Sequence, residues 1–148
     1  MPPYKGKFTP DNPNKYMGDA DNIIYRSGWE RRAMKYFDIN PGVLKWASEE
    51  VVIPYYDSVS KKVRRYFPDF LIKVQTAEGN TQTHLIEVKP SKDLRPPVGG
   101  RGKKKSTVLY EMKTYRMNQD KFAAARKWCD DRNIIWDVWT EKQLKQKG

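Results

Sequence analysis

The chain has 148 residues, with 29 Lys and Arg against 18 Asp and Glu, which gives a formal net charge of +11 at pH 7. This length suits one domain with a core of its own, and an aromatic content of 13% argues against wholesale disorder. A single cysteine excludes an internal disulfide, and no apolar run fits a signal peptide or a membrane span. We therefore expect a protein that is not secreted and has no membrane partner, and the positive charge favours nucleic acid.

The N-terminal part predicts an arm followed by a helix. Residues 1–18 are polar and rich in proline, so we expect an arm there and the folded domain over residues 19–148. A helix is expected to begin at Ser27, because Ser27 and Glu30 have the spacing of a capping box. Apolar residues then recur on one helical face, and Pro41–Gly42 ends the helix.

A strand-rich stretch follows this helix. The first strand contains Pro54, which cannot donate to a ladder and so favours an edge or bulged position. The second is kinked by Pro68, and turns are expected over residues 57–61 and 77–80. The expected strands are Glu50–Tyr56, Val63–Val74 and Thr83–Lys89.

The last third combines a basic loop, a long helix and a final strand. Residues 90–106 are rich in proline, glycine, lysine and arginine and predict a loop. Helical periodicity follows over residues 107–132, with an interruption expected near Asn118, and Ile134–Trp139 predicts a short strand before a last helical turn. The expected order is α-β-β-β-α-β, which is a single mixed α+β domain.

Two carboxylates form the sharpest local pattern. An antiparallel hairpin centred on Glu78 places Asp69 directly opposite Glu87, with the Cβ atoms roughly 4.5–5.5 Å apart. Two like charges at that distance are unfavourable unless a cation lies between them, and a hard divalent cation accepts carboxylate oxygens. Lys89 projects from the same face of the strand and could hold a water near that metal. The ordinary alternative is a solvated strand face that carries charges.

Glu30 has two interpretations. As the fourth residue of the capping box it satisfies a backbone N–H, which contributes about 1 kcal/mol. It also lies beside the apolar face of its helix, so its side chain could point toward the sheet and add a third carboxylate to a metal site.

The pattern of Glu30, Pro68–Asp69 and Glu87–Lys89 resembles the PD-(D/E)xK nuclease superfamily, whose core has the same element order. A closer resemblance is to the head-completion nucleases of T-even-type tailed phages. It rests on the blocks from Tyr25 to Arg31 and from Val59 to Phe70, and it covers most of the chain.

This resemblance implies a magnesium-dependent deoxyribonuclease, with Mn²⁺ able to substitute for Mg²⁺. Asp69, Glu87, Glu30 and the backbone carbonyl of Val88 would be metal ligands, and Lys89 would support the attacking water. The enzyme would act late in head assembly, on packaged DNA, in the host cytoplasm or associated with the virion. Capsid, portal or neck proteins are the implied protein partners. The alternatives are a head–tail joining or DNA-binding protein with a vestigial site, and a junction-resolving endonuclease.

DNA would be held mainly through its phosphate backbone. Strand alternation is expected to place Arg65 on the same face as Asp69. A solvated hairpin and a disordered linker are the alternatives for the basic segments, and His84 and Cys129 are expected to be structural. The residues expected to contact DNA are Arg26, Lys62, Arg65, Arg101, Lys103, Lys104 and Lys105.

Overall fold

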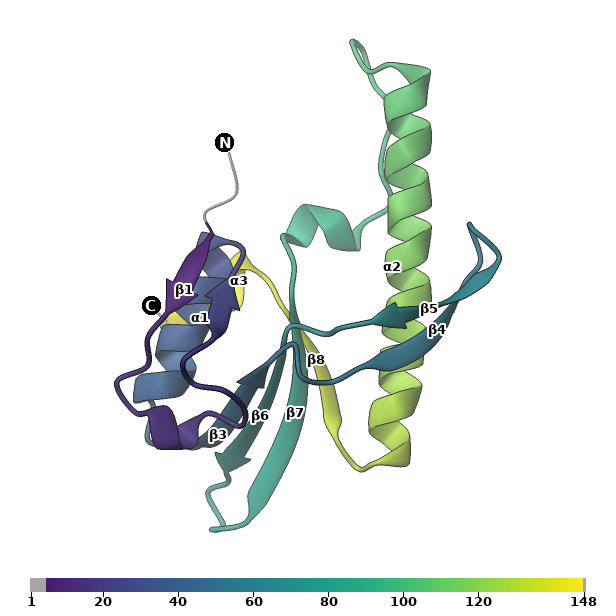
Figure 1. Cartoon of the computed structure of the whole chain (residues 1–148). Helices are drawn as coiled ribbons and strands as arrows, with labels where there is room; N and C mark the ends of the chain where they lie inside the picture. Colours follow the sequence, from purple (N-terminus) through teal and green to yellow (C-terminus); the bar gives the residue numbers. More distant parts are fainter. Residues whose placement is uncertain (1–4, 148) are drawn as a thin grey trace.

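A four-stranded mixed sheet organises the computed structural model, which describes residues 5–147 (Figure 1). The sheet order is β3-β6-β7-β8, with antiparallel pairing among the first three strands and parallel pairing between β7 and β8. The parallel pair needs a crossover, which the long helix α2 provides. The strands are β3 (Val43–Ser48), β6 (Phe70–Gln75), β7 (Thr81–Val88) and β8 (Ile135–Trp139).

The sheet separates two hydrophobic clusters, because successive side chains of a strand point to opposite faces. Ile72 and Ile86 lie in one cluster with the buried side chains of α1. Leu71 and Leu85 lie in the other cluster with the buried side chains of α2. The helices are α1 (Gly28–Ile39), α2 (Lys105–Asp131) and the short α3 (Glu141–Lys147), which packs against α1.

A separate β-hairpin leaves the sheet after β3 and packs against α2 (Figure 1). It consists of β4 (Ile53–Asp57) and β5 (Lys62–Tyr66), which pair only with each other. Its buried tyrosines, Tyr55 and Tyr66, join Ala125 and Cys129 of α2 in one cluster. The hairpin therefore extends the α2 side of the fold beyond the sheet.

The N-terminal segment packs on the α1 side of the fold. Phe8 and Tyr16 are buried against Trp46, with ring centroids 5.8 and 4.7 Å from that of the tryptophan. The carboxylate of Asp38 accepts the backbone N–H groups of Asp11 and Asn12 at 2.7 and 3.0 Å. The segment contains β1 (Gly6–Phe8), a 3-10 turn (Pro13–Lys15) and β2 (Ile23–Tyr25), and residues 1–4 of the expected arm lie outside the described residues.

The mixed α+β class is confirmed, together with the first helix, both turns and the edge position of the strand that contains Pro54. Ser27 is the N-cap of α1, as expected, and its hydroxyl accepts the backbone N–H of Glu30 at 3.1 Å. Within residues 5–147, no helix combines the length and apolar character needed to cross a membrane.

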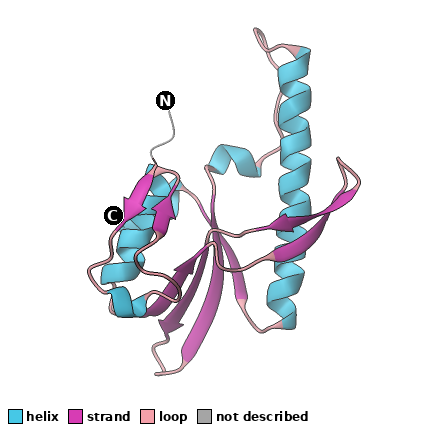
Figure 2. Cartoon of the chain, viewed as in Figure 1, coloured by secondary structure: helices cyan, strands magenta, loops and turns pink. Residues whose placement is uncertain are grey.

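Two expectations about the elements are wrong, and three strands were not predicted. Strand β3 was not expected, and the stretch Val63–Val74 forms two strands rather than one kinked strand, because the chain breaks around Pro68. Helix α2 includes Asn118, and Figure 2 shows this helix without a break. The small strands β1 and β2 were not expected either, since their residues carry no alternating pattern long enough to indicate them.

Candidate functional site

The candidate site lies where β3 and β7 end, β6 begins and the N-terminus of α1 approaches them. In the β6–β7 hairpin Phe70 pairs with Ile86, so the next pair outward is Asp69 and Glu87, which is the expected register. Glu87 shares the strand face of Leu85 and therefore points to the α2 side of the sheet, while Asp69 lies just before β6 at the edge of this face.

Asp69 and Glu87 are each held by a hydrogen bond, the first from β7 and the second from the β4–β5 hairpin. One carboxylate oxygen of Asp69 accepts the backbone N–H of Val88 at 2.7 Å. Glu87 is only 6% exposed, and its carboxylate accepts the hydroxyl of Tyr66 at 2.6 Å. Each carboxylate thus has a fixed orientation before any ligand binds.

Burial and crowding make both groups harder to ionise. Burial raises the pKa of the Asp69 carboxyl well above its usual range, and the charge of Glu87 raises it further. Burial also raises the pKa of Glu87, against the opposing effects of the Tyr66 hydrogen bond and the Lys89 charge. A pair of this kind gains stability from a positive charge placed beside it.

Lys89 projects beside Glu87, as the strand alternation predicts. Its ammonium lies 3.7 Å from the Glu87 carboxylate, and its side chain is 27% exposed. The backbone N–H of Lys89 donates to the carbonyl of Trp139 at 2.9 Å, so pairing with β8 fixes the end of β7. The ammonium can therefore reach both the carboxylate pair and solvent.

Glu30 lies both at the capped start of α1 and beside Asp69. Its backbone N–H is capped by Ser27, and its carboxylate accepts the backbone N–H of Arg26 at 3.4 Å. The same carboxylate lies in a cluster with Asp69. Burial raises the pKa of Glu30, while the hydrogen bond from Arg26 lowers it.

Glu49 is a site residue that the sequence patterns did not reveal. Carboxylate oxygens of Glu30, Glu49 and Asp69 all lie within 4.8 Å of one another. Ser48 pairs with Phe70, so Glu49 is the next residue outward beside Asp69, and its backbone N–H donates to the Asp69 carbonyl at 3.0 Å. Its φ of 56° turns the chain out of β3 at this point.

Arg26 provides a positive charge at this cluster. Its guanidinium forms a hydrogen-bonded ion pair with the Glu49 carboxylate. That hydrogen bond raises the pKa of Arg26 above its ordinary value. Three carboxylates with only hard oxygen donors are a chemically suitable set for a divalent cation such as Mg²⁺ or Mn²⁺.

The other predicted DNA contacts lie outside this cluster. Alternation does not carry from Arg65 to Asp69, because β5 ends at Tyr66 and a new strand begins at Phe70. The side chain that reaches the site from the hairpin is instead Tyr66. Arg65 is exposed, and its guanidinium lies 5.9 Å from the ring centroid of Phe67.

The basic loop and the beginning of α2 are mostly exposed and project away from the sheet (Figure 1). The loop follows a short 3-10 turn, Ser91–Leu94. Lys103 forms an ion pair of 2.9 Å with Glu111 on α2. The remaining predicted contacts, which are Lys62, Arg101, Lys104 and Lys105, are exposed.

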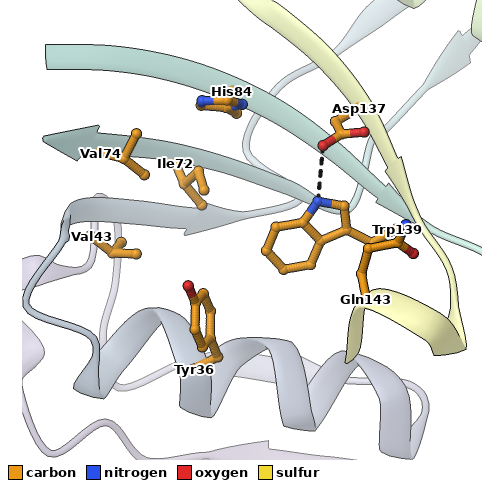
Figure 3. A pocket seen from close by; sticks show the side chains of 8 residues that line it. All are labelled: Tyr36, Val43, Ile72, Val74, His84, Asp137, Trp139 and Gln143. Carbon is orange, nitrogen blue, oxygen red and sulfur yellow. Dashed lines mark hydrogen bonds between the residues drawn. The ribbon is translucent and has the colours of Figure 1, made fainter. Parts of the chain in front are cut away.

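A cavity of about 300 Å³ lies on the other side of the sheet (Figure 3). His84 lines it together with Ile72 and Asp137, and the Asp137 carboxylate accepts the indole N–H of Trp139 at 3.1 Å. Burial lowers the pKa of His84. Its position opposite to Glu87 agrees with a structural role for this histidine.

Cys129 lies in the cluster under α2, where it is fully buried. Burial raises the pKa of its thiol to about 11, which is the reverse of what a nucleophilic cysteine needs.

Two comparisons with known proteins relate the chain to nucleases. Residues 40–141 match the family described as TnsA-like endonuclease N terminal. The chain is also 37% identical over 148 residues to the head completion nuclease of Enterobacteria phage T4, an alignment that covers 98% of this chain and 96% of that protein. The matched family segment contains Glu49, Asp69, Glu87 and Lys89, while Glu30 precedes it.

Proposed function

The chain belongs to the family of TnsA-like endonucleases and is a nuclease, and we propose that it hydrolyses phosphodiester bonds of DNA while a phage head is completed. The resemblance that the sequence showed to phage head-completion nucleases is confirmed. The observation that carries the proposal is the pairing of half-buried Asp69 with buried Glu87, with Lys89 beside them.

The proposed cofactor is Mg²⁺, for which Mn²⁺ would substitute. The residues that would hold it are Asp69, Glu87 and Glu30, with the carbonyl of Val88, and the clustering of Glu49 with Glu30 and Asp69 adds it to this set. When bound, such an ion neutralises charge on the scissile phosphate and lowers the pKa of water.

The chain's own groups would prepare the reaction. Val88 and Tyr66 hold the two central carboxylates through hydrogen bonds, so these groups need little rearrangement as charge develops. Lys89 would orient the attacking water and stabilise its developing negative charge from the solvent-facing side of Glu87.

The substrate is held, in this proposal, by exposed basic residues that contact the phosphate backbone without reading sequence. Arg65 and Lys62 would contribute from the β4–β5 hairpin, and the basic loop from the beginning of α2. Packaged DNA in the host cytoplasm is the proposed target, and capsid, portal or neck proteins are the proposed partners. The name of the phage T4 relative, head completion nuclease, supports the part of this proposal that concerns completing the head.

The proposal is tested by incubating the purified chain with circular plasmid and with end-labelled linear DNA, in Mg²⁺, in Mn²⁺ and in EDTA. We expect cleavage with either ion and none in EDTA. Linearisation of the plasmid shows endonuclease action, whereas shortening only from labelled ends shows exonuclease action. Exposed Glu78 on the same hairpin supplies a matched control, because Glu78→Gln should cut normally while Glu87→Gln should not.

Two results would contradict the proposal. DNA binding without cleavage under every metal condition would indicate a head–tail joining or DNA-binding protein. Cleavage restricted to four-way junctions would indicate a junction-resolving enzyme.

A further inference from the structure

Lys121 is a lysine of α2 that faces the candidate site without belonging to the motif. Its ammonium lies 5.6 Å from the ring centroid of Tyr66 and 6.0 Å from that of Tyr55. The hydroxyl of Tyr66 donates to Glu87, so Lys121 lies next to the residue that holds this carboxylate. Packing of the β4–β5 hairpin against α2 produces this arrangement.

The charge environment places Lys121 within electrostatic range of the same carboxylates. Burial lowers the pKa of Lys121, and the neighbouring charge of Lys89 lowers it further. The charges of Glu87, Asp57 and Asp69 act in the opposite direction. Lys89 and Lys121 are therefore two cations that approach one carboxylate pair, the first from β7 and the second from α2.

Among the side chains that the structure describes, the ammonium of Lys121 has no acceptor of its own. Within residues 5–147 no oxygen lies at hydrogen-bond or ion-pair distance from it, although the side chain is half-buried. The two tyrosine rings offer only weak cation–π attraction, about 0.5–2 kcal/mol. A partly desolvated cation without an acceptor costs free energy, and this cost is recovered when an anion binds.

Resting on the proposed nuclease function, we propose that Lys121 binds a nonbridging phosphate oxygen of the cleaved DNA strand at Asp69 and Glu87. A phosphate oxygen supplies the charge-assisted hydrogen bond that the ammonium lacks. The phosphate would enter between α2 and the end of β7, with Lys121 on one side and Lys89 on the other. Lys121 is thus a substrate-binding residue contributed by the crossover helix.

The main competing explanation is indirect. Lys121 could act only through Tyr66, by keeping its ring in place and so orienting Glu87. In that case its loss would slow cleavage without changing the salt dependence of DNA binding.

The test compares Lys121→Met and Lys121→Arg with Lys127→Met, a matched control that removes an exposed lysine from the same helix. Binding of a fluorescent DNA duplex is titrated in Ca²⁺ over a range of salt concentrations, and single-turnover cleavage is measured in Mg²⁺. For Lys121→Met we expect the slope of log affinity against log salt to become shallower by about 0.9, the contribution of one neutralised phosphate. We also expect roughly 10- to 100-fold slower cleavage, typical of losing a hydrogen bond to a charged group. Lys121→Arg should keep the wild-type slope, and Lys127→Met should match wild type in both measurements.

An unchanged salt slope in Lys121→Met, with slower cleavage, would overturn the inference and leave Lys121 as a positioning residue for Glu87. Wild-type cleavage by Lys121→Met would overturn it as well. A melting temperature for each variant checks the fold, and Lys121→Gln replaces Lys121→Met if the apolar side chain unfolds the protein. Failure of wild type to cut any DNA would instead contradict the proposed nuclease reaction, while the salt slopes would still report whether Lys121 contacts phosphate.

Discussion

Charged residues occur in two very different settings in this protein. At the end of the β6–β7 hairpin they are few, largely buried and individually held, as Asp69 is by Val88 and Glu87 is by Tyr66. Along the β4–β5 hairpin and the loop before α2 they are numerous and exposed, and Lys103 is one of the few with an ion-pair partner.

The exact position of each charged residue should therefore decide its effect in the first region, whereas the total charge should decide DNA binding in the second. A buried carboxylate moved by one residue would point to the other face of the sheet and leave the site. An exposed lysine moved by one residue still attracts the same phosphate backbone. Substitutions should therefore have large, residue-specific effects at the site and small, additive effects in the basic segments.

The largest expected effect comes from neutralising a carboxylate of the central pair. Asp69→Asn keeps the shape of the side chain and an acceptor for Val88, but it removes the negative charge. We expect roughly a 100- to 1,000-fold loss of metal-dependent cleavage, with the fold intact. Single-turnover cleavage and circular dichroism measure the two properties. Wild-type cleavage by this variant would remove Asp69 from the proposed site.

A smaller effect is expected at the outer carboxylates, where capping and metal binding can be separated. Glu30→Gln should preserve the capping box but cut poorly, with partial recovery at high Mg²⁺. Ser27→Ala should show the reverse, losing about 1 kcal/mol of stability with little change in cleavage. Glu49→Gln should behave like Glu30→Gln, because both belong to one cluster. Cleavage is measured over a range of Mg²⁺ concentrations, and stability by denaturant melts. Normal cleavage by Glu30→Gln at low Mg²⁺ would assign Glu30 to capping alone.

The basic loop should respond in proportion to the number of charges removed. Neutralising Lys103, Lys104 and Lys105 together should weaken DNA binding and reduce its salt dependence, by up to about 0.9 in slope for each phosphate that is no longer neutralised. Binding titrations at several salt concentrations measure this directly. An unchanged slope would assign the loop to a protein partner instead.

The last expected effect is on the stability of the metal-free protein rather than on DNA, and it depends on pH. A carboxyl whose pKa is raised by folding binds its proton more tightly in the folded chain than in the unfolded chain. The resulting stability is complete below the unfolded pKa, about 4 for Asp, and is lost as the pH rises through the folded pKa. The raised pKa of Asp69 therefore destabilises the metal-free protein as the pH increases above about 4.

Asp69→Asn removes this titration, so its stability advantage over wild type in EDTA should grow with pH. Each pH unit between the unfolded and folded pKa contributes about 1.4 kcal/mol. Denaturant melts of both proteins from pH 4 to 8 provide the measurement. A constant difference between the two proteins would show that Asp69 has the same pKa folded and unfolded.

The sequence predicted the inner part of the site because a short turn fixed its register. Five residues separate Gln75 from Thr81, which leaves little freedom in how the two strands pair, and Asp69 then falls opposite Glu87. Glu49 would follow from the register of β3 against β6 in the same way, since it extends that pairing by one residue. Its strand is joined to β6 through a whole hairpin, however, and no turn sets that register.

Tyr66 and Lys121 were beyond sequence patterns for a different reason. Both reach the site through packing of the β4–β5 hairpin on α2, which is tertiary contact between elements that do not share a sheet. A tyrosine in a short strand and a lysine in a polar helix have no distinctive spacing. The position of Arg65 relative to Asp69 was not predictable from strand alternation either. The chain breaks around Pro68, and alternation holds only within one continuous strand.

The order in which the central strands meet has a consequence for folding kinetics. The β6–β7 pairing needs only a local turn, whereas β8 joins β7 across the basic loop and all of α2, so its pairing is intrinsically slower. We therefore expect Asp69 and Glu87 to be brought together before α2 packs over the sheet. Repulsion between the two carboxylates opposes this pairing, so we expect the candidate site to slow the formation of the hairpin that carries it.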